Sequence, residues 1–385
     1  MFGNSDFILR FFSSIWIISC AFISYILLLR FINFKTALIF LAIFMLNPNT
    51  IYYAQELRNY AMLLGNSSIF CVICFIVYKI MQGKIDRKYA NRFYIALALL
   101  GVSLVLTHYY AYIFIFSSGI IMICLSLKQK RFIKQTLLTF IFIGLVGIIW
   151  LGVHIEIGGL LDKILDSHKG LTWVHDGNLF SLIFSIILAS LGKYGWGIFI
   201  ISCIYLVVKY KLEFIKIVAD YLPFILIIIL ELGIISLIYH FGTKTMTTRY
   251  FVMLYPFIYL FIAIVFSIYF KNLVPIILLS ALILHSIYLS HIYKKEDIRA
   301  ASEYVRGEFN PKNCKLPIGW IAYARYLPEY EIIEKPILQE NCDLIFFGVD
   351  NSSDFKSTIE TLKQHNISSY KIKSFNGGIV VVKDN

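Results

Sequence analysis

Long apolar runs separated by short polar segments extend along the chain from residue 7 to residue 291. A transmembrane helix needs about 20 mostly apolar residues, because it rises about 1.5 Å per residue across a hydrocarbon layer of about 30 Å. The pattern therefore predicts about ten membrane-spanning helices. They cover residues 7–29, 36–52, 62–82, 93–112, 113–127, 135–154, 179–208, 221–240, 250–270 and 273–291.

Two interruptions in this pattern predict local geometry. The stretch 93–127 is too long for one span and short for two, and His108, Tyr109 and Tyr110 lie at its midpoint, so we expect a tight helical hairpin there. Pro48 falls inside the second predicted span and should end or kink its helix, because proline cannot donate a backbone hydrogen bond.

The pattern changes after residue 293, which divides the chain into a transmembrane domain, 1–293, and a second domain, 294–385. Charged residues, proline and glycine return there, a helical stretch covers 296–306, and apolar runs of strand length cover 330–333, 344–349, 370–372 and 378–382. These elements predict a small α/β domain. It contains Cys314 and Cys342, which an oxidising compartment would permit to pair, although sequence leaves their distance open.

Composition supports a mainly α, polytopic membrane protein. Apolar residues make up 59% of the chain and charged residues 15%, whereas soluble domains carry about 45–50% and about 25%. Basic residues concentrate in alternate short loops, which the positive-inside rule places in the cytoplasm. They are Arg30, Lys35, Lys79, Lys84, Arg87, Lys88, Arg92, Lys128, Lys130, Arg131, Lys134, Lys209, Lys211, Lys216 and Lys271.

This asymmetry predicts a multi-pass protein of the cell (inner or plasma) membrane whose C-terminal domain is extracytoplasmic. It also accounts for much of the formal net charge of +12, so no nucleic-acid partner is implied.

Polar residues in the opposite loops are the candidates for chemistry. The densest cluster is 47–60, where Arg58 offers a planar donor fork that suits phosphate and Glu56 could orient it or accept a proton. A helix over 52–60 would divide this cluster between two faces. One face would carry Tyr52, Gln55, Arg58 and Asn59, and the other Tyr53, Glu56 and Tyr60. An interfacial anchor of tyrosines with a Glu–Arg pair explains the same residues.

Three further clusters lie in loops on the same predicted side. His108 and Tyr109 lie in the hairpin turn, and Lys244 with Arg249 could bind an anion beside Tyr250. The loop 154–178 carries acids together with His168 and His175, but it lacks any HExxH or CxxC spacing, so no metal is predicted. Because Glu231 alone is a mid-span acid, an extracytoplasmic site is favoured over an ion path.

Several of these stretches resemble the GT-C-type glycosyltransferases that use polyprenyl-phosphate sugars, which include protein O-mannosyltransferases and the aminoarabinose transferases of lipid A. The resemblance runs in order along nearly the whole chain, and its most specific part is 52–60, YYAQELRNY. The other matching stretches are FGNSDFILR at 2–10, HYY at 108–110, RY at 249–250 followed by Pro256, and DIRAA at 297–301.

The resemblance implies transfer of a sugar from a polyprenyl-phosphate donor to an extracytoplasmic glycan, lipid or protein acceptor, in contact with membrane lipids. It assigns the donor phosphate to Arg58, oriented by Gln55 and Glu56, with Arg249 and Tyr250 as second candidates for the phosphate. His108 and Tyr109 would contact the sugar or the acceptor. No cofactor or metal is expected, since a donor without pyrophosphate has less need of a bridging cation.

In this family a span and an outer loop with the acidic catalytic base precede the FGxSxFxxR stretch. We therefore expect that base upstream of Met1, and the topology also calls for an upstream span. The competing hypothesis is a non-catalytic or degenerate protein of envelope polysaccharide assembly, flippase-like or polymerase-like. The nearly clean spans disfavour a flippase, and the absence of arginine from 154–178 disfavours a polymerase.

Overall fold

The computed structural model describes residues 6–56, 59–156, 179–241, 248–270, 273–292, 298–318, 326–333, 342–349, 353–364, 369–375 and 378–384. The chain divides into two compact units, Met1–Ile287 and Tyr288–Asn385, so the cut falls within the last apolar helix, whereas sequence reasoning places it after residue 293. Each unit is described by itself.

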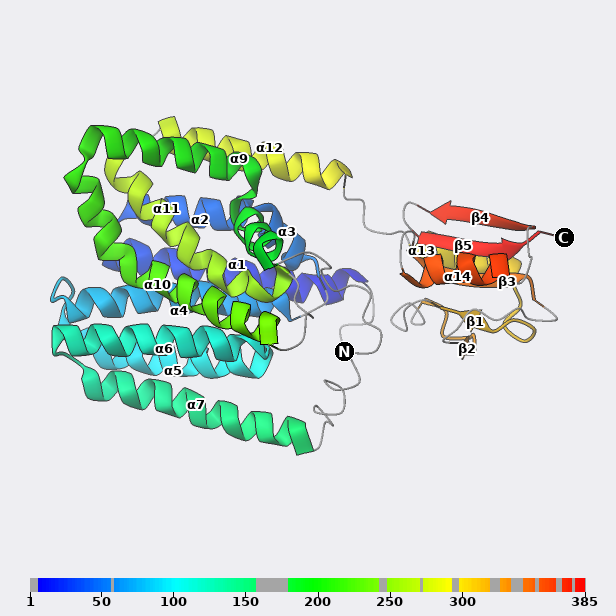
Figure 1. The fold of residues 1–385 in the computed structure, drawn as a ribbon, viewed down its shortest axis with the longest axis horizontal. Helices are drawn as coiled ribbons and strands as arrows, with labels where there is room; N and C mark the ends of the chain where they lie inside the picture. Colours follow the sequence, from blue (N-terminus) through cyan, green and yellow to red (C-terminus); the bar gives the residue numbers. More distant parts are fainter. Residues whose placement is uncertain are drawn as a thin grey trace. The chain divides into compact units, whose positions relative to one another are not determined.

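The first unit is a bundle of helices (Figure 1). Its elements are α1 (Asp6–Phe31), α2 (Phe34–Leu46), α3 (Pro48–Ala54), α4 (Tyr60–Met81), η1 (Arg87–Tyr89), α5 (Ala90–Thr107), α6 (Tyr110–Gln129), α7 (Ile133–Glu156), α9 (Leu179–Tyr210), α10 (Leu212–Phe241), η3 (Thr248–Leu254), α11 (Tyr255–Tyr269) and α12 (Leu273–Ile292). Eight helices in the described part are long and apolar enough to cross a membrane. The mainly helical, multispanning fold is thus confirmed.

The two predicted interruptions are present. α2 ends at Leu46, and α3 begins at Pro48 with a bend of 62° between them. Asn47 supports the bend because its side chain accepts from Asn49 N at 2.9 Å and donates to Ser190 O at 2.6 Å. This bent pair makes a ninth span if it crosses as one, while the apolar part of α12, Pro275–Tyr288, is shorter, so a tenth span stays a prediction.

The predicted hairpin is confirmed too, since α5 ends at Thr107 and α6 begins at Tyr110. One break was not expected. Gly192 adopts a φ of +70° inside α9, which sequence reasoning treated as one continuous span. A side chain there would be strained by that φ, and its Cβ would lie 2.8 Å from His285 Cδ2, so glycine is required at this kink.

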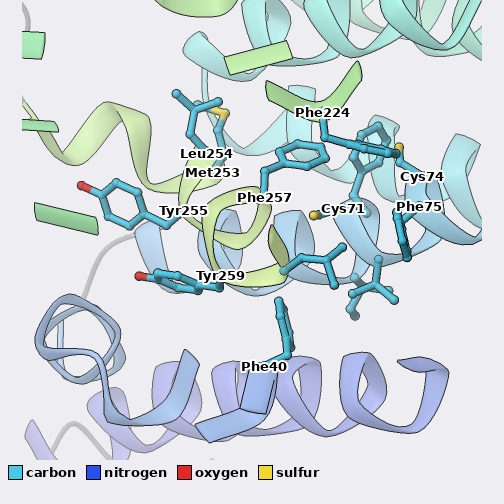
Figure 2. Close-up of a cluster of buried hydrophobic side chains, with 14 of the residues drawn as sticks. Phe40, Cys71, Cys74, Phe75, Phe224, Met253, Leu254, Tyr255, Phe257 and Tyr259 are labelled. Atoms are coloured by element: carbon cyan, nitrogen blue, oxygen red, sulfur yellow. The ribbon is translucent and has the colours of Figure 1, made fainter. Parts of the chain in front are cut away.

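α4 is the centre of the bundle. Of its most apolar 18 residues, 94% are buried, because α1, α5, α6, α11 and η3 all pack against it. Figure 2 shows this core, in which Phe75 of α4 packs on Phe224 of α10 at a centroid distance of 5.6 Å, and Phe224 packs on Phe257 of α11 at 5.8 Å. A helix that is apolar all round is expected to be buried all round, as α4 is.

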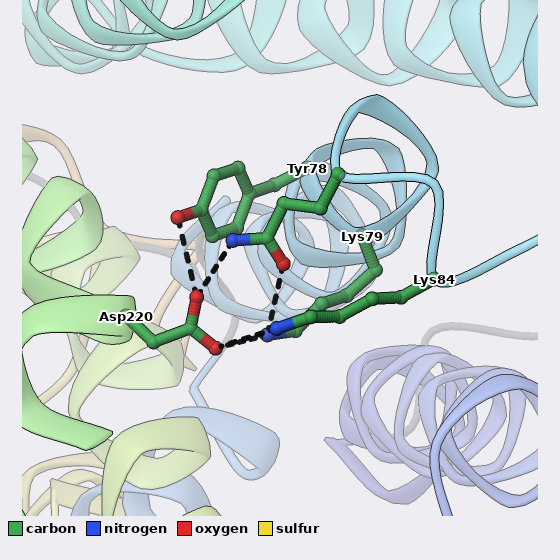
Figure 3. A network of polar contacts seen from close by, with 5 residues as sticks. Tyr78, Lys79, Lys84 and Asp220 are labelled. Atoms are coloured by element: carbon green, nitrogen blue, oxygen red, sulfur yellow. Dashed lines mark hydrogen bonds and ion pairs between the residues drawn. The ribbon is translucent and has the colours of Figure 1, made fainter. Parts of the chain in front are cut away.

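A polar network joins α10 to α4 at the end of the bundle that carries the basic loops (Figure 3). Asp220 of α10 forms an ion pair with Lys79 and a longer one, 3.5 Å, with Lys84. Its other carboxylate oxygen accepts from Gln82 Nε2 at 2.7 Å and from the Tyr78 hydroxyl at 3.3 Å. The half-buried carboxylate is therefore surrounded by donors.

The second unit is a small α/β domain, as predicted. α13 (Ile298–Glu308) buries Ile298, Ala301 and Val305, and β3 (Leu344–Val349), β5 (Gly378–Lys383) and β4 (Tyr370–Phe375) form an antiparallel sheet in the order β3-β5-β4. Two short strands, β1 (Leu316–Pro317) and β2 (Ile332–Ile333), pair in parallel. Sequence reasoning missed α14 (Ser353–Gln364).

A disulfide joins Cys314 to Cys342 in this unit, with the two Cα atoms 5.2 Å apart. Sequence had left the pairing open. Cys314 follows α13 and Cys342 precedes β3, so the bond connects the helix to the sheet.

Candidate functional site

Four of the residues singled out from sequence meet at the end of the bundle opposite the basic loops. Tyr60 begins α4, His108 lies in the α5–α6 turn, and Arg249 and Tyr250 belong to η3. The centroid of His108 lies 5.8 Å from that of Tyr60 and 5.1 Å from that of Tyr250. With Tyr110, these residues form what we call the arginine–tyrosine cluster.

Local contacts hold the three segments together. Asn59 Nδ2 donates to Thr107 O at 2.5 Å, which joins the start of α4 to the end of α5. The Tyr110 ring stacks on that of Tyr250 at 4.9 Å and 19°, which holds η3 against α6. The cluster is therefore built from two helix ends and one turn that are distant in the sequence.

Arg249 provides the fixed cation of the cluster. Its Cζ lies 5.8 Å from the Tyr60 ring centroid and 5.9 Å from that of Tyr250, within the about 6 Å at which a cation is attracted to an aromatic face. The side chain is half-buried. A guanidinium stays charged at any physiological pH, and its planar fork matches phosphate or carboxylate oxygens.

His108 is held as a neutral ring. Burial, and then the positive charge of Arg249, lower the pKa of His108 to about 4. Its Nδ1 accepts from Tyr110 N at 3.2 Å, so in the neutral ring the proton is on Nε2. His108 Nε2 is consequently a hydrogen-bond donor. It can donate to a ligand oxygen, but it cannot act as a base that removes a proton.

A continuous helix over 52–60, which would have given the two faces considered from sequence, is not formed. α3 ends at Ala54, Gln55 is its C-cap, and α4 begins only at Tyr60. Two hydroxyls of α1 bond carbonyls of this segment: Ser14 Oγ donates to Ala54 O at 2.8 Å and Ser13 Oγ donates to Glu56 O at 3.1 Å. Hydroxyl groups thus bond the carbonyls that backbone N–H groups four residues on would bond in a continuous helix.

Gln55 and Glu56 therefore lie in a loop fixed to α1. Gln55 is exposed and Glu56 is half-buried. Tyr53, the buried residue of this segment, connects α3 to the cluster, because its ring centroid lies 5.6 Å from that of Tyr60. The YAQE segment and the cluster are neighbours through this pair of rings.

Other predicted residues are not placed in the cluster. Tyr109 is 44% exposed and packs edge-on against His154 of α7 at 5.9 Å. Arg58, Lys244 and the histidines of the 154–178 loop beyond residue 156 lie outside the described residues. In the described part of the chain no three His, Cys, Asp or Glu side chains gather as metal ligands would.

Two polar groups near this end were not among the predicted site residues. Arg10 Nε on α1 and the Tyr255 hydroxyl on α11 are buried with no hydrogen-bond partner among the described residues. Figure 2 shows the hydroxyls of Tyr255 and Tyr259 pointing to the same side, away from the apolar core. The sequence signal for the two tyrosines is their spacing of four residues on an apolar helix, which places Tyr255 and Tyr259 on one face.

Comparison of the chain with protein-family models, with curated proteins and with solved structures gives no match.

Proposed function

We propose that this protein is a membrane glycosyltransferase that moves a sugar from a polyprenyl-phosphate donor to an extracytoplasmic glycan, lipid or protein acceptor. The observation that carries the proposal is the position of Arg249 on the faces of Tyr60 and Tyr250, beside the neutral His108. All four residues belong to stretches that resemble the polyprenyl-phosphate-dependent family.

Sugar transfer from such a donor requires a group that stabilises the departing lipid phosphate, because negative charge grows on that phosphate in the transition state. Preorganised cations and N–H donors do this with little reorganisation. Arg249 supplies the cation, and His108 Nε2–H supplies a neutral donor next to it. The acceptor hydroxyl must lose its proton to a positioned carboxylate, and Glu56, fixed by the loop after α3, is the described candidate to orient the phosphate-binding groups or accept that proton.

The location of the site supports the same proposal. α4 runs from Tyr60 to Met81, which is about 30 Å, so the cluster and the basic residues that follow α4 lie at opposite ends of one span. By the positive-inside rule the cluster would face away from the cytoplasm. The Cys314–Cys342 disulfide supports an extracytoplasmic C-terminal domain, because disulfides persist in oxidising compartments.

Binding of undecaprenyl phosphate to the purified protein in lipid nanodiscs tests whether Arg249 contacts the donor phosphate. A hydrogen bond to a charged group contributes about 1.5–3 kcal/mol, which corresponds to about 10- to 150-fold in affinity. Arg249→Ala should therefore bind the lipid about 10- to 150-fold more weakly, and Arg249→Lys should lie between it and the wild type. The matched control is Lys193→Ala, which removes another cation held over a tyrosine ring, 4.9 Å from the centroid of Tyr194, and should bind normally.

A transfer assay with a panel of polyprenyl-phosphate sugars separates the enzyme from its alternative. Turnover that falls in Arg249→Ala, normalised to folded protein, supports the glycosyltransferase. Binding that depends on Arg249 without transfer from any donor would favour a non-catalytic protein of polysaccharide assembly. Equal lipid affinity in Arg249→Ala and the wild type would show that the arginine–tyrosine cluster does not bind the donor phosphate.

A further inference from the structure

A groove of about 440 Å³ lies at the basic end of the bundle, away from the arginine–tyrosine cluster. Its floor is α4, with Ile69 and Ile73, and its two walls are α1 and α5, which both pack on α4. Ile26 lines the α1 side, and Ala96 and Leu100 line the α5 side. The volume falls in the range of about 300–1,000 Å³ that is typical of ligand sites.

Two arginines mark one end of this groove. Arg30 comes from the end of α1, and Arg92 comes from the first turn of α5. Between them, the Phe31 ring packs edge-on against Tyr89 and Phe93, with both pairs of centroids 5.1 Å apart. The groove is thus apolar along its length and cationic only at its mouth.

Neither arginine is neutralised within the described part of the chain. No carboxylate there forms an ion pair with Arg30 or Arg92, and Arg30 instead lies over the Phe31 ring, 5.7 Å from its centroid. Asp86, the acid in the segment between α4 and α5, forms its ion pair with Lys88 at 3.1 Å. The mouth therefore fits an anion and offers no acidic partner for an ammonium headgroup.

The length of the groove fits one leaflet. Arg92 and Leu100 are eight residues apart on α5, so the groove extends about 12 Å from the arginines along that helix. One leaflet contributes about half of the about 30 Å hydrocarbon layer. An ordinary acyl chain matches this depth, whereas a polyprenyl chain would extend well beyond it.

We infer that this groove binds one anionic glycerophospholipid from the leaflet at the basic end. Its phosphate lies between Arg30 and Arg92, and one acyl chain lies on Ile69 and Ile73. The inference does not depend on sugar transfer, because it concerns a different end of the bundle and different residues.

Native mass spectrometry of the detergent-solubilised protein tests it with three probes: dioleoyl phosphatidylglycerol, dioleoyl phosphatidylcholine and undecaprenyl phosphate. The first two have the same acyl chains and differ in headgroup charge. The wild type should retain phosphatidylglycerol in preference to the other two lipids. The double variant Arg30→Gln, Arg92→Gln should lose phosphatidylglycerol affinity by about tenfold or more, because both charge-assisted contacts are gone.

Two further variants locate the effect. Arg87→Gln with Lys128→Gln removes the same charge from exposed positions outside the groove and should bind like the wild type. Ala96→Trp fills the groove and should lower the retention of phosphatidylglycerol and phosphatidylcholine alike. Arg30→Lys with Arg92→Lys keeps the charge and should retain part of the preference, which guards against a loss caused by misfolding.

An equal loss in the Arg87, Lys128 variant would mean diffuse attraction to the basic end and would overturn the site. If undecaprenyl phosphate displaces phosphatidylglycerol and its own binding is lost in the double glutamine variant, the occupant is not a glycerophospholipid and the inference is overturned. Unchanged phosphatidylglycerol binding in the folded double glutamine variant would show that Arg30 and Arg92 do not contact the lipid.

Discussion

Acidification from pH 6.5 to pH 4 is expected to destabilise the membrane domain through His108. Its ring is enclosed by Tyr60, Tyr110 and Tyr250, with Arg249 nearby, so a second proton on the ring would be both desolvated and beside a cation. Protonation would also break the hydrogen bond from Tyr110 N to Nδ1, because a protonated Nδ1 cannot accept.

The magnitude follows from the two pKa values. The pKa of His108 falls from an ordinary value of 6.5 to about 4 in the folded protein, a difference of 2.5. Each pKa unit corresponds to about 1.36 kcal/mol. Because the folded-state pKa is the lower one, the unfolded chain takes up the proton first. Stability is therefore fully present above pH 6.5, falls by about 2 kcal/mol at pH 5, and has lost about 3 kcal/mol near pH 4.

The variant His108→Asn isolates this contribution. Its side-chain oxygen can replace Nδ1 as the acceptor for Tyr110 N, but it cannot titrate, so the variant should lose less stability than the wild type between pH 6.5 and pH 5. The measurement is unfolding in mixed micelles followed by tryptophan fluorescence at each pH, with the His108 pKa read from ¹⁵N-histidine NMR.

Arg249→Gln distinguishes the two causes of the shift. Burial is the larger cause, so the pKa of His108 should rise in this variant but stay below 6.5. A pKa that returns to 6.5 would make the arginine charge dominant. A wild-type unfolding curve with the same pH dependence as His108→Asn would refute the buried, neutral histidine.

Three further predictions concern stability. Cys342→Ser opens a cross-link that spans 28 residues and should cost the C-terminal unit about 3–4 kcal/mol, measured by its unfolding with and without reductant. Asp220→Asn removes the charge that pairs with Lys79 and should lower the melting temperature of the membrane domain, whereas Asp86→Asn, in an exposed pair, should leave it unchanged. Gly65→Ala should cost about 1–3 kcal/mol, because its Cβ would lie 2.9 Å from a buried sulfur of α1, while Gly144→Ala meets nothing within 4 Å and should be neutral or slightly stabilising.

Local sequence was sufficient where one segment decides its own structure. Pro48 follows the end of α2 and begins α3, as its ring and its missing N–H predict, and the His108 turn follows from a stretch too long for one span. α14 was also readable in principle, since Phe355, Thr358, Ile359 and Leu362 follow helical spacing, but its short polar pattern was overlooked.

The candidate site was only partly readable. Sequence indicated an anion-binding role for Arg249, yet nothing local brings Tyr60, His108 and Tyr250 around it or predicts that Tyr109 packs on His154 instead. The loop at Gln55 is likewise held by distant residues, because hydroxyls of Ser13 and Ser14 on α1 donate to the carbonyls of Glu56 and Ala54.

The sequence by itself determined that this chain enters a membrane, roughly where its helices lie and where a small α/β domain follows. Each of these depends on hydrophobicity and charge summed over neighbouring residues. Tertiary structure alone decided that α4 is central, that Arg249 lies on the rings of Tyr60 and Tyr250, and that Cys314 reaches Cys342. Those outcomes depend on which helix faces meet, and helix–helix packing is set by the complementary shapes of distant segments.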